Sequence, residues 1–307
     1  MSQPQRIVSL LPSSTEMVCA LGMGERLVGV SHECDYPAEV VGLPILTEPK
    51  LDPSGTSRAI DDRVRQLVQD GLSVYRLKTD LLRDLKPDLI VTQDQCEVCA
   101  VSVSEVERAV QSLLASDVGL VSLSPQRLGD IWYDMQGLAQ ALGQDEQAED
   151  LLRGLKKRVW KVEQRTRHLE RPRVACLEWL DPLMASANWV PEMVEIAGGT
   201  YDLAAAGDHS PTLSWDRLLE AQPEVVVIMP CGFPIAQSQA ELPTLIAHPD
   251  WQRLPAVQAG RVYIADGNAY LNRPGPRIVE SIELLAEMLH PEACAGLAPE
   301  GSYIPAA

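Results

Sequence analysis

The sequence is poor in positive charge and lacks the motifs that mark the common enzyme classes. Its 26 Lys and Arg residues face 43 Asp and Glu residues, so the formal net charge is −17. Phosphate binding needs a basic surface, and this balance argues against a nucleic-acid partner. Nucleophile elbows, phosphate-cradling loops and His-Glu-x-x-His motifs are missing. Gly22-x-Gly24 has no third glycine at the required spacing, which excludes a dinucleotide-binding fingerprint.

Long apolar runs are missing as well. No run reaches the roughly 18 apolar residues of a spanning helix, so we do not expect the chain to cross a membrane. The seven cysteines, an odd number, favour free thiols or metal ligands over a disulfide framework. The first apolar strand begins at Ile7, which leaves no room for a signal peptide. The sequence as written therefore predicts a cytoplasmic protein, or a periplasmic or surface-anchored one if a leader was removed.

The most informative feature that is present is a segment that occurs twice. Residues 81–92 and 218–228 each predict a short helix, a turn of Pro followed by an acidic residue, and a buried strand that leads to a cysteine-bearing loop. The proline ends the helix because it biases the residue before it away from the helical region. The apolar, β-branched strand is typical of a parallel sheet covered on both faces.

The repeat predicts an α/β fold with two Rossmann-like lobes, each built on a central parallel sheet and joined by a long backbone helix. Ligands of open parallel sheets bind at the carboxyl ends of the strands, so we expect a ligand cleft between the lobes. The predicted organisation is an N-terminal lobe over 1–125, a linking helix over 126–170, a C-terminal lobe over 171–290 and a tail over 291–307.

Capping residues and helical spacing give the local expectations. Ser13 or Ser14 is expected to cap a helix that begins near Thr15, and Ser214 to cap the helix over 215–221. The tail from Pro291 is expected to be surface-bound or loose.

A stretch of about 40 residues with helical spacing, interrupted at Gly143, would measure up to about 60 Å if straight. Its basic end is expected to be a solvated face rather than a binding patch. The basic residues are Arg153, Lys156, Lys157, Arg158, Lys161, Arg165 and Arg167.

Cysteine and histidine side chains offer candidate metal ligands. Cys96 and Cys99 form a Cys-x-x-Cys pair, which fits a redox pair or half of a metal site. His32, Cys34 and Cys231 lie in loops expected to face the same cleft, so a four-ligand set for zinc or iron is one interpretation. The alternative is that these are small, half-buried residues in tight loops, because cysteine is among the most buried residue types.

Aromatic residues gather in the loops that follow the predicted strands. Their flat faces suit a large planar ligand, although Trp and Tyr also cover the ends of cores. His32 and Asn188 would add polar contacts. The predicted ligand-binding residues are Ser13, Ser14, His32, Tyr36, Cys96, Cys99, Trp179, Asn188, Trp189, Phe233, Tyr270 and Arg273.

Several segments together resemble one known family. In their order and spacing they are similar to the helical-backbone (class III) metal-chelate substrate-binding proteins, in a form without a signal peptide, and the resemblance covers about residues 6–290. The segments that carry it are residues 6–16, 35–37, 85–90, 197–199, 218–228 and 273–278. The chain departs from the family pattern in a helical insertion near 50–75 and in the Cys96/Cys99 loop.

The resemblance implies non-enzymatic binding of cobalamin or a related corrinoid, for uptake, trafficking or storage. Haem and siderophore binders share the architecture, so such a metal chelate is an alternative ligand. A thiol- or metal-dependent enzyme acting through Cys96 and Cys99 is a second alternative. By position, Asp80 and Asp216 correspond to the family's carboxylates that dock on an ABC permease; the alternative is that they are ordinary carboxylates at helix N-termini.

Overall fold

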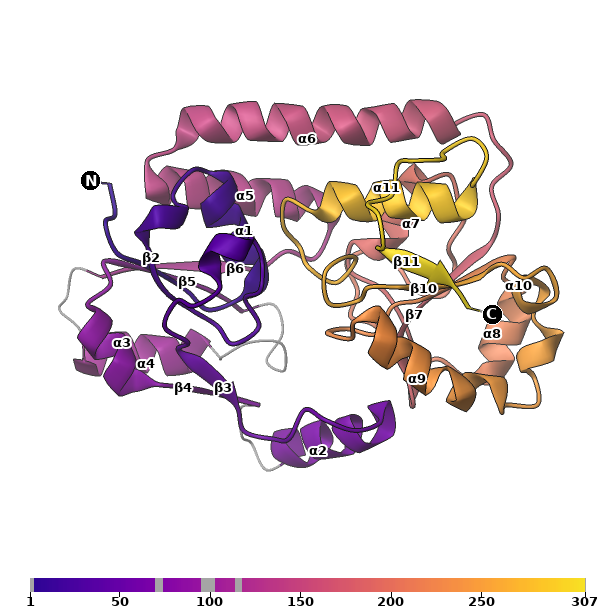
Figure 1. Ribbon diagram of the computed structural model, residues 1–307, viewed down its shortest axis with the longest axis horizontal. Coiled ribbons are helices and arrows are strands. Elements are labelled where there is room, and N and C mark those ends of the chain that lie inside the picture. Colours follow the sequence, from indigo (N-terminus) through magenta and orange to yellow (C-terminus); the bar gives the residue numbers. More distant parts are fainter. Residues whose placement is uncertain (1–2, 70–73, 95–102, 114–117, 307) are drawn as a thin grey trace. The chain divides into compact units, whose positions relative to one another are not determined.

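The chain forms two compact units, each with its own sheet (Figure 1). This computed structural model describes residues 3–69, 74–94, 103–113 and 118–306. Unit 1 comprises Met1–Gly55, Asp62–Pro125 and Gly129–Arg153. Unit 2 comprises Thr56–Asp61, Gln126–Leu128 and Gly154–Ala307.

The first half of the chain alternates strands and helices. Its elements are β1 (Ile7–Ser9), α1 (Pro12–Ala20), β2 (Leu27–Val30), β3 (Thr47–Pro49), α2 (Ser57–Gln69), β4 (Tyr75–Leu77), α3 (Thr79–Leu85), β5 (Leu89–Gln93), α4 (Val103–Leu113), β6 (Gly119–Leu123), α5 (Leu128–Leu142) and α6 (Asp145–Thr166).

The second half repeats the alternation. Its elements are β7 (Val174–Leu180), β8 (Leu183–Ala185), α7 (Val190–Ile196), α8 (Trp215–Ala221), β9 (Val225–Ile228), α9 (Ile235–Ile246), α10 (Pro255–Gln258), β10 (Val262–Ala265), α11 (Ile278–Leu289) and β11 (Tyr303–Pro305). No helix in the described part of the chain has both the length and the apolar character needed to cross a bilayer.

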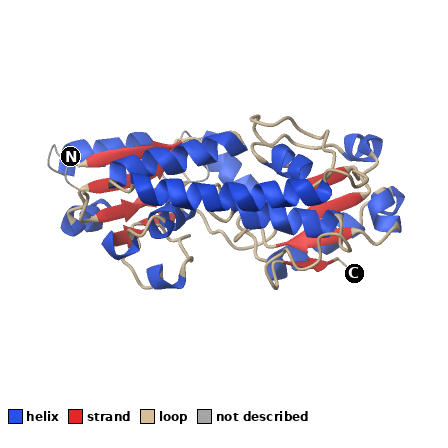
Figure 2. Ribbon diagram, turned by 90° about the horizontal axis from the view of Figure 1, so that it is seen from above, coloured by secondary structure: helices blue, strands red, loops and turns tan. Residues whose placement is uncertain are grey.

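The four-stranded sheet of unit 1 is parallel, as the repeat predicts, and β3 and β4 form a separate antiparallel pair. Its order is β2-β1-β5-β6, with Ile7 opposite both Leu27 and Leu89. All five residues of β5 are buried, and helices flank the strands (Figure 2). The α/β class predicted from the apolar runs is therefore confirmed.

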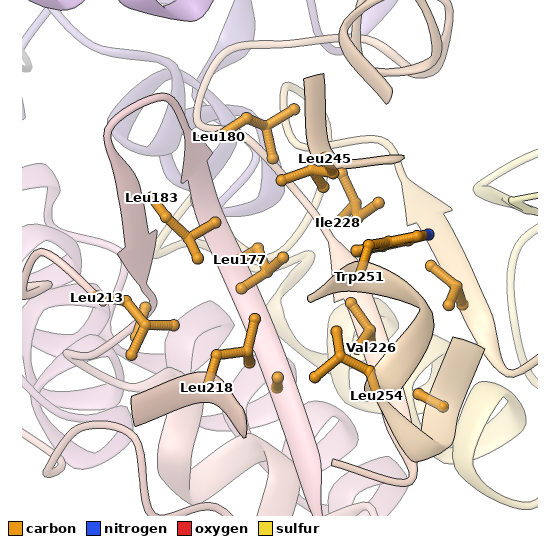
Figure 3. Packing of buried hydrophobic residues seen from close by; sticks show 14 of the residues in the cluster. Leu177, Leu180, Leu183, Leu213, Leu218, Val226, Ile228, Leu245, Trp251 and Leu254 are labelled. Atoms are coloured by element: carbon orange, nitrogen blue, oxygen red, sulfur yellow. The ribbon is translucent and has the colours of Figure 1, made fainter. Parts of the chain in front are cut away.

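The sheet of unit 2 has a parallel centre and antiparallel edges. The order is β11-β10-β9-β7-β8, with β7, β9 and β10 parallel. Figure 3 shows Leu177 of β7 with Val226 and Ile228 of β9, packed together with Trp251 and Leu254. Each such fully buried side chain stabilises the fold by about 1.5–3 kcal/mol.

Of the two alternatives expected for the tail, surface-bound or loose, the second is wrong, because the tail adds a strand to the edge of the sheet. β11 lies beside β10 (Figure 1) and pairs with it antiparallel, and Ile264 lies opposite Ile304. Cys294 is fully buried. A strand of three residues that ends in proline gives almost no periodic signal, although proline is tolerated on a sheet edge because it need not donate to a neighbour.

The two copies of the repeat end their helices in the same way. α3 stops at Lys86 (φ +47) and α8 stops at Gln222 (φ +45), both in the left-handed region. Each residue precedes a proline, which is why the helix leaves the right-handed region at that point. The predicted helix, turn and strand are thus confirmed in both copies.

The acidic residue after each proline fixes the neighbouring strand. The Asp88 carboxylate accepts the backbone N–H groups of Gln5 (2.8 Å) and Arg6 (3.0 Å), just before β1. The Glu224 carboxylate accepts the N–H of Arg173 (3.0 Å), just before β7. Each copy therefore sets the start of the strand beside it, and the strand ends are positioned alike in the two units.

The helical stretch of about 40 residues is interrupted at Gly143, as its spacing predicts, and forms two helices. α5 ends at Leu142 and α6 begins at Asp145; Gly143 lies between them with φ +66. The N–H of Gln144 donates to the carbonyl of Ala139 (2.8 Å), which closes the end of α5. Glycine readily adopts the left-handed conformation that this kind of helix C-terminus requires. α6 alone has 22 residues and runs from unit 1 into unit 2.

Only one of the two predicted caps forms. The Ser214 side chain accepts the N–H of Arg217 (3.2 Å) and caps α8 as expected. The helix expected to start after Ser13 or Ser14 starts earlier, at Pro12, with Leu11 at its N-cap and no side-chain cap. Proline is favoured in the first turn of a helix because its missing N–H would have no partner there.

Candidate functional site

The strand ends of unit 1 carry a network of buried hydroxyl groups. Ser14 Oγ lies 2.6 Å from Ser9 Oγ, and Thr15 Oγ1 donates to the same Ser9 oxygen at 2.7 Å. Ser13 and Ser14 are both buried, and Thr15 Oγ1 is 3.1 Å from Cys34 Sγ. This network joins the end of β1 to α1 and to the loop after β2. The ligand-binding role predicted for the two serines stays a prediction.

His32 is held in place by two neighbours. Its Nδ1 lies 2.7 Å from Thr47 Oγ1, and its ring lies 5.2 Å from the ring of Tyr75. Burial lowers the pKa of His32, and Lys78 lowers it further while Glu48 raises it. A neutral imidazole is the form that coordinates a metal or accepts a hydrogen bond. Since Nδ1 is engaged by Thr47, Nε2 is the nitrogen that would meet a ligand.

The predicted metal ligands are only partly described. Among the described residues, no group of three or more His, Cys, Asp or Glu side chains could hold a metal ion. His32 and Cys34 belong to unit 1, whereas Cys231 is an exposed cysteine of unit 2. Cys96 and Cys99 lie outside the described residues. The four-ligand set therefore stays a prediction, and so does the ligand cleft expected from the sequence.

Asp134 on α5 is a half-buried carboxylate near the end of β6. Burial raises its pKa to about 6, and the negative charges of Asp130 and Asp94 act in the same direction. The backbone N–H of Ser124, which donates to Asp134 Oδ2 at 3.1 Å, offsets part of this effect. In the folded chain this side chain therefore holds its proton up to a higher pH than in the unfolded chain.

Replacing Asp134 by asparagine is expected to stabilise the protein at pH 8 by about 1 kcal/mol. The full shift would correspond to about 3 kcal/mol, reduced here because the carboxylate is partly exposed. The native protein binds more protons than the unfolded one between pH 3.8 and about 6, so the Asp134 contribution weakens the fold as pH rises through that window. Urea unfolding at pH 8 and pH 3.5 tests this; an equal advantage at both pH values would contradict it.

The strand ends of unit 2 present an aromatic pair. Trp179 of β7 contacts Phe233, with ring centroids 5.1 Å apart and planes at 61°. Phe233 is buried, whereas Trp179 is only half-buried. Trp179 Nε1 donates to the carbonyl of Ser57 (3.2 Å), which fixes the indole. Phe233 thus packs against the indole at a steep angle, and part of the Trp179 side chain stays exposed.

Trp189 and Tyr270 differ from Trp179 in their surroundings. Trp189 is 5% exposed and donates from Nε1 to the carbonyl of Leu271 (2.8 Å). It therefore packs beneath the loop after β10 instead of presenting an open face. Tyr270 is half-buried beside the Arg277 guanidinium, whose carbon lies 5.4 Å from the ring centroid. Burial raises the pKa of Tyr270, so its hydroxyl stays neutral.

Arg273, in the loop after β10, and Asn188, after β8, add polar groups to unit 2. Arg273 is 7% exposed, and its Nη2 donates to Asn268 Oδ1 (3.0 Å). Asn188 adopts φ +51, and its buried Oδ1 has no hydrogen-bond partner among the described residues. A buried oxygen of this kind costs about 1–3 kcal/mol if it stays unsatisfied, so a donor on a ligand would relieve it.

The loops after β9 and β10 are locked together. The N–H of Asn268 donates to the carbonyl of Phe233 (3.2 Å). The N–H of Gly232 donates to the carbonyl of Gly267 (3.3 Å). Asn272 Nδ2 donates to the carbonyls of Met229 (2.9 Å) and Gly267 (3.0 Å). The position of Phe233, and with it that of Trp179, therefore depends on the loop after β10.

A buried polar cluster under this face was not expected from the sequence. Glu178 Oε2 accepts the hydroxyls of Ser186 (2.6 Å) and Ser210 (2.8 Å), and Tyr201 donates to the carbonyl of Ser186 (2.6 Å). Burial raises the pKa of Glu178, while the two hydroxyl donors lower it. The only signal in the sequence was a carboxylate directly before Trp179 in an otherwise apolar strand.

Asp80 and Asp216 occupy equivalent positions in the two copies of the repeat. Each lies in the first turn of its helix, α3 or α8, and each side chain is exposed. Asp80 pairs with Arg83 at 3.0 Å. Tyr36, the remaining candidate in the described chain, is 46% exposed and precedes a cis proline.

A comparison with known proteins matches most of this chain to one protein family. The model of the periplasmic binding protein family matches residues 7–269. An uncharacterised ABC transporter substrate-binding lipoprotein of Bacillus subtilis is 23% identical over 94% of this chain and 81% of its own length. A vitamin B12-binding protein of Pectobacterium atrosepticum is 25% identical over 81% of this chain and 82% of its own length.

Solved structures show the same fold. A periplasmic haem-binding protein of Pseudomonas aeruginosa superposes with a TM-score of 0.70 over 94% of both chains, at 20% identity. The α/β architecture of this chain is therefore that of a known group of binding proteins.

Proposed function

This chain belongs to the periplasmic binding protein family, and we propose that it binds cobalamin or a related corrinoid for an uptake system. The family consists of substrate-binding proteins that are not enzymes, so the resemblance predicted from the sequence is confirmed at that level. The thiol-dependent enzyme considered as an alternative finds no support in this membership. Binding and delivery are the activities to test.

The observation that carries the proposal is the partly exposed indole of Trp179, which packs against Phe233 and donates to the carbonyl of Ser57. It lies at the carboxyl end of a parallel strand, where open α/β sheets bind ligands. A rigid indole gives a large planar macrocycle a broad contact. Asn188 Oδ1 adds an acceptor for a donor on the ligand, such as an amide N–H at the edge of a corrinoid.

Delivery implies a membrane partner. We propose that Asp80 and Asp216 dock on arginine residues of an ABC permease, since both are exposed and stand at equivalent places in the repeat. Of the two locations that the sequence allows, a periplasmic or surface-anchored one suits this role. One relative is described as a substrate-binding lipoprotein, which agrees with that choice.

Titration with hydroxocobalamin tests the proposed function. We expect a calorimetric heat and a shift of the cobalamin absorption spectrum at micromolar protein. Trp179→Ala should weaken binding at least tenfold, because loss of a stacked indole removes about 1.4 kcal/mol or more.

Trp160→Ala is the matched control, since this indole on α6 is 57% exposed and makes no part of the strand ends. It should leave the affinity unchanged. Haem, titrated in parallel, tests the alternative ligand. No heat and no spectral shift with cobalamin would overturn the proposal, and so would tight binding of haem alone.

A further inference from the structure

The charges of α6 are divided between its two ends. In a chain of net charge −17, residues 153–167 carry seven Lys and Arg residues and one carboxylate, Glu163. The first turns of the helix are acidic instead, with Asp145, Glu146, Glu149 and Asp150. A local basic surface therefore stands out from an acidic protein, and the packing around it determines whether it is only a solvated face.

A pocket of about 430 Å³ opens beside this basic segment, wholly within unit 2. This size lies in the usual range for small-molecule sites. Val162 and Leu297 supply its apolar wall. Its charged lining residues are Arg158, Lys161 and Arg165 of α6 and Glu283 of α11.

The single carboxylate of the lining is already neutralised. Arg158 donates from Nε to Glu283 Oε1 (3.0 Å) and from Nη2 to Oε2 (2.6 Å). This bidentate pair raises the pKa of Arg158 and keeps it charged. The side chain of Glu283 is 12% exposed, so the Arg158–Glu283 pair is a well-ordered part of the pocket lining.

Two cations remain uncompensated. Within residues 3–69, 74–94, 103–113 and 118–306, neither Lys161 nor Arg165 forms a salt bridge. Together they give the pocket lining a surplus of two positive charges, since the third cation, Arg158, pairs with Glu283 and also lies 4.0 Å from Glu280, outside the lining. A guanidinium matches phosphate oxygens with two parallel donors, and a lysine adds a mobile point charge.

We infer that this pocket is a binding site for a phosphate group attached to an apolar body, separate from the strand-end face of unit 2. Lys161 and Arg165 bind the phosphate oxygens. Val162 and Leu297 contact the apolar part. The Arg158–Glu283 pair holds α6 against α11, so the two cations stand on a rigid support.

Phenyl phosphate is the probe that tests the site. At low ionic strength we expect calorimetric binding and a raised melting temperature, both weakened about tenfold or more by Lys161→Gln combined with Arg165→Gln. Both side chains are exposed, so this variant should fold normally. Cobalamin binding should not change, which separates this test from that of the proposed function.

The matched control removes the same charge from the same helix. Lys156→Gln combined with Lys157→Gln leaves the pocket lining intact and should leave phenyl phosphate binding within about twofold. Equal weakening by the two double variants would show a diffuse field and overturn the inference. Absence of binding at millimolar phenyl phosphate, in both the calorimeter and the melting curve, would also overturn it.

Two further probes identify the source of the phosphate. Vesicles of phosphatidylglycerol, compared with vesicles of phosphatidylcholine, report a lipid headgroup, and inorganic phosphate reports a free ion. Binding of either that is lost in the Lys161/Arg165 variant and kept in the Lys156/Lys157 variant supports the site. Binding that survives in both variants contradicts it.

Discussion

Replacing Gly267 by alanine is expected to lower the free energy of unfolding by about 2–4 kcal/mol. A Cβ at this position would lie 2.1 Å from the carbonyl oxygen of Pro230 and 2.9 Å from both the carbonyl carbon and the oxygen of Met229. These atoms belong to the backbone that follows β9, so no rotamer change can make room. The loops after β9 and β10 would have to separate.

The same substitution should remove ligand binding. Separation of the loops breaks the bonds from Gly232 to Gly267 and from Asn268 to Phe233, and Phe233 supports Trp179. Urea unfolding and cobalamin titration of the Gly267→Ala protein measure the two effects. A variant that unfolds at the wild-type urea concentration would show that the loops are not locked as described.

Gly154→Ala is the control for this experiment. Gly154 lies on α6, and a Cβ there would meet nothing within 4 Å. Alanine should stabilise the helix by about 0.5–1 kcal/mol, because glycine is the weaker helix former. The two variants add the same methyl group, so their opposite signs would assign the cost at Gly267 to contact with Pro230.

The fold could be predicted from the sequence because the repeat combines several local signals that agree. These signals are a continuous apolar run, a proline and a capping residue such as Ser214. Each of them affects the conformation of residues only a few positions away in the sequence. The partner of the acidic residue was not predictable in this way. Asp88 bonds to the N–H of Arg6, 82 residues away, and only the parallel register of β1 and β5 brings them together.

The candidate site was harder to predict, since the exposure of an aromatic side chain is a tertiary property. Trp179 lies near the end of β7 and Trp189 follows β8, and both are expected to face a ligand. Yet Trp189 is buried by the loop after β10, whose carbonyl at Leu271 accepts its Nε1 proton. Loop composition indicated that aromatic residues gather here, but it could not tell which of them keeps an open face.

The C-terminal strand gives the second large prediction. We expect deletion of residues 302–307 to lower the free energy of unfolding by about 2–3 kcal/mol. β11 pairs with β10 along Tyr263, Ile264 and Ala265, and the N–H of Ala306 donates to the carbonyl of Val262 (2.8 Å). Removal leaves β10 as an unpaired edge and uncovers Ile264 of the core.

The deletion should also reach the candidate site, because the carbonyl of Ser302 accepts the N–H of Asp266 (3.0 Å), the first residue of the loop after β10. Hydrogen exchange is expected to quicken at Asp266 and its neighbours and to stay unchanged in β5 of unit 1. Tyr303→Phe is the control: it removes only the hydroxyl that donates to Glu287 (3.3 Å) and should cost under about 1 kcal/mol. If the deletion costs no more than Tyr303→Phe, the pairing of β11 contributes nothing to stability. If it costs more, that difference measures what the pairing of β11 with β10 contributes to stability, and the hydrogen exchange at Asp266 reports whether this support reaches the loop after β10.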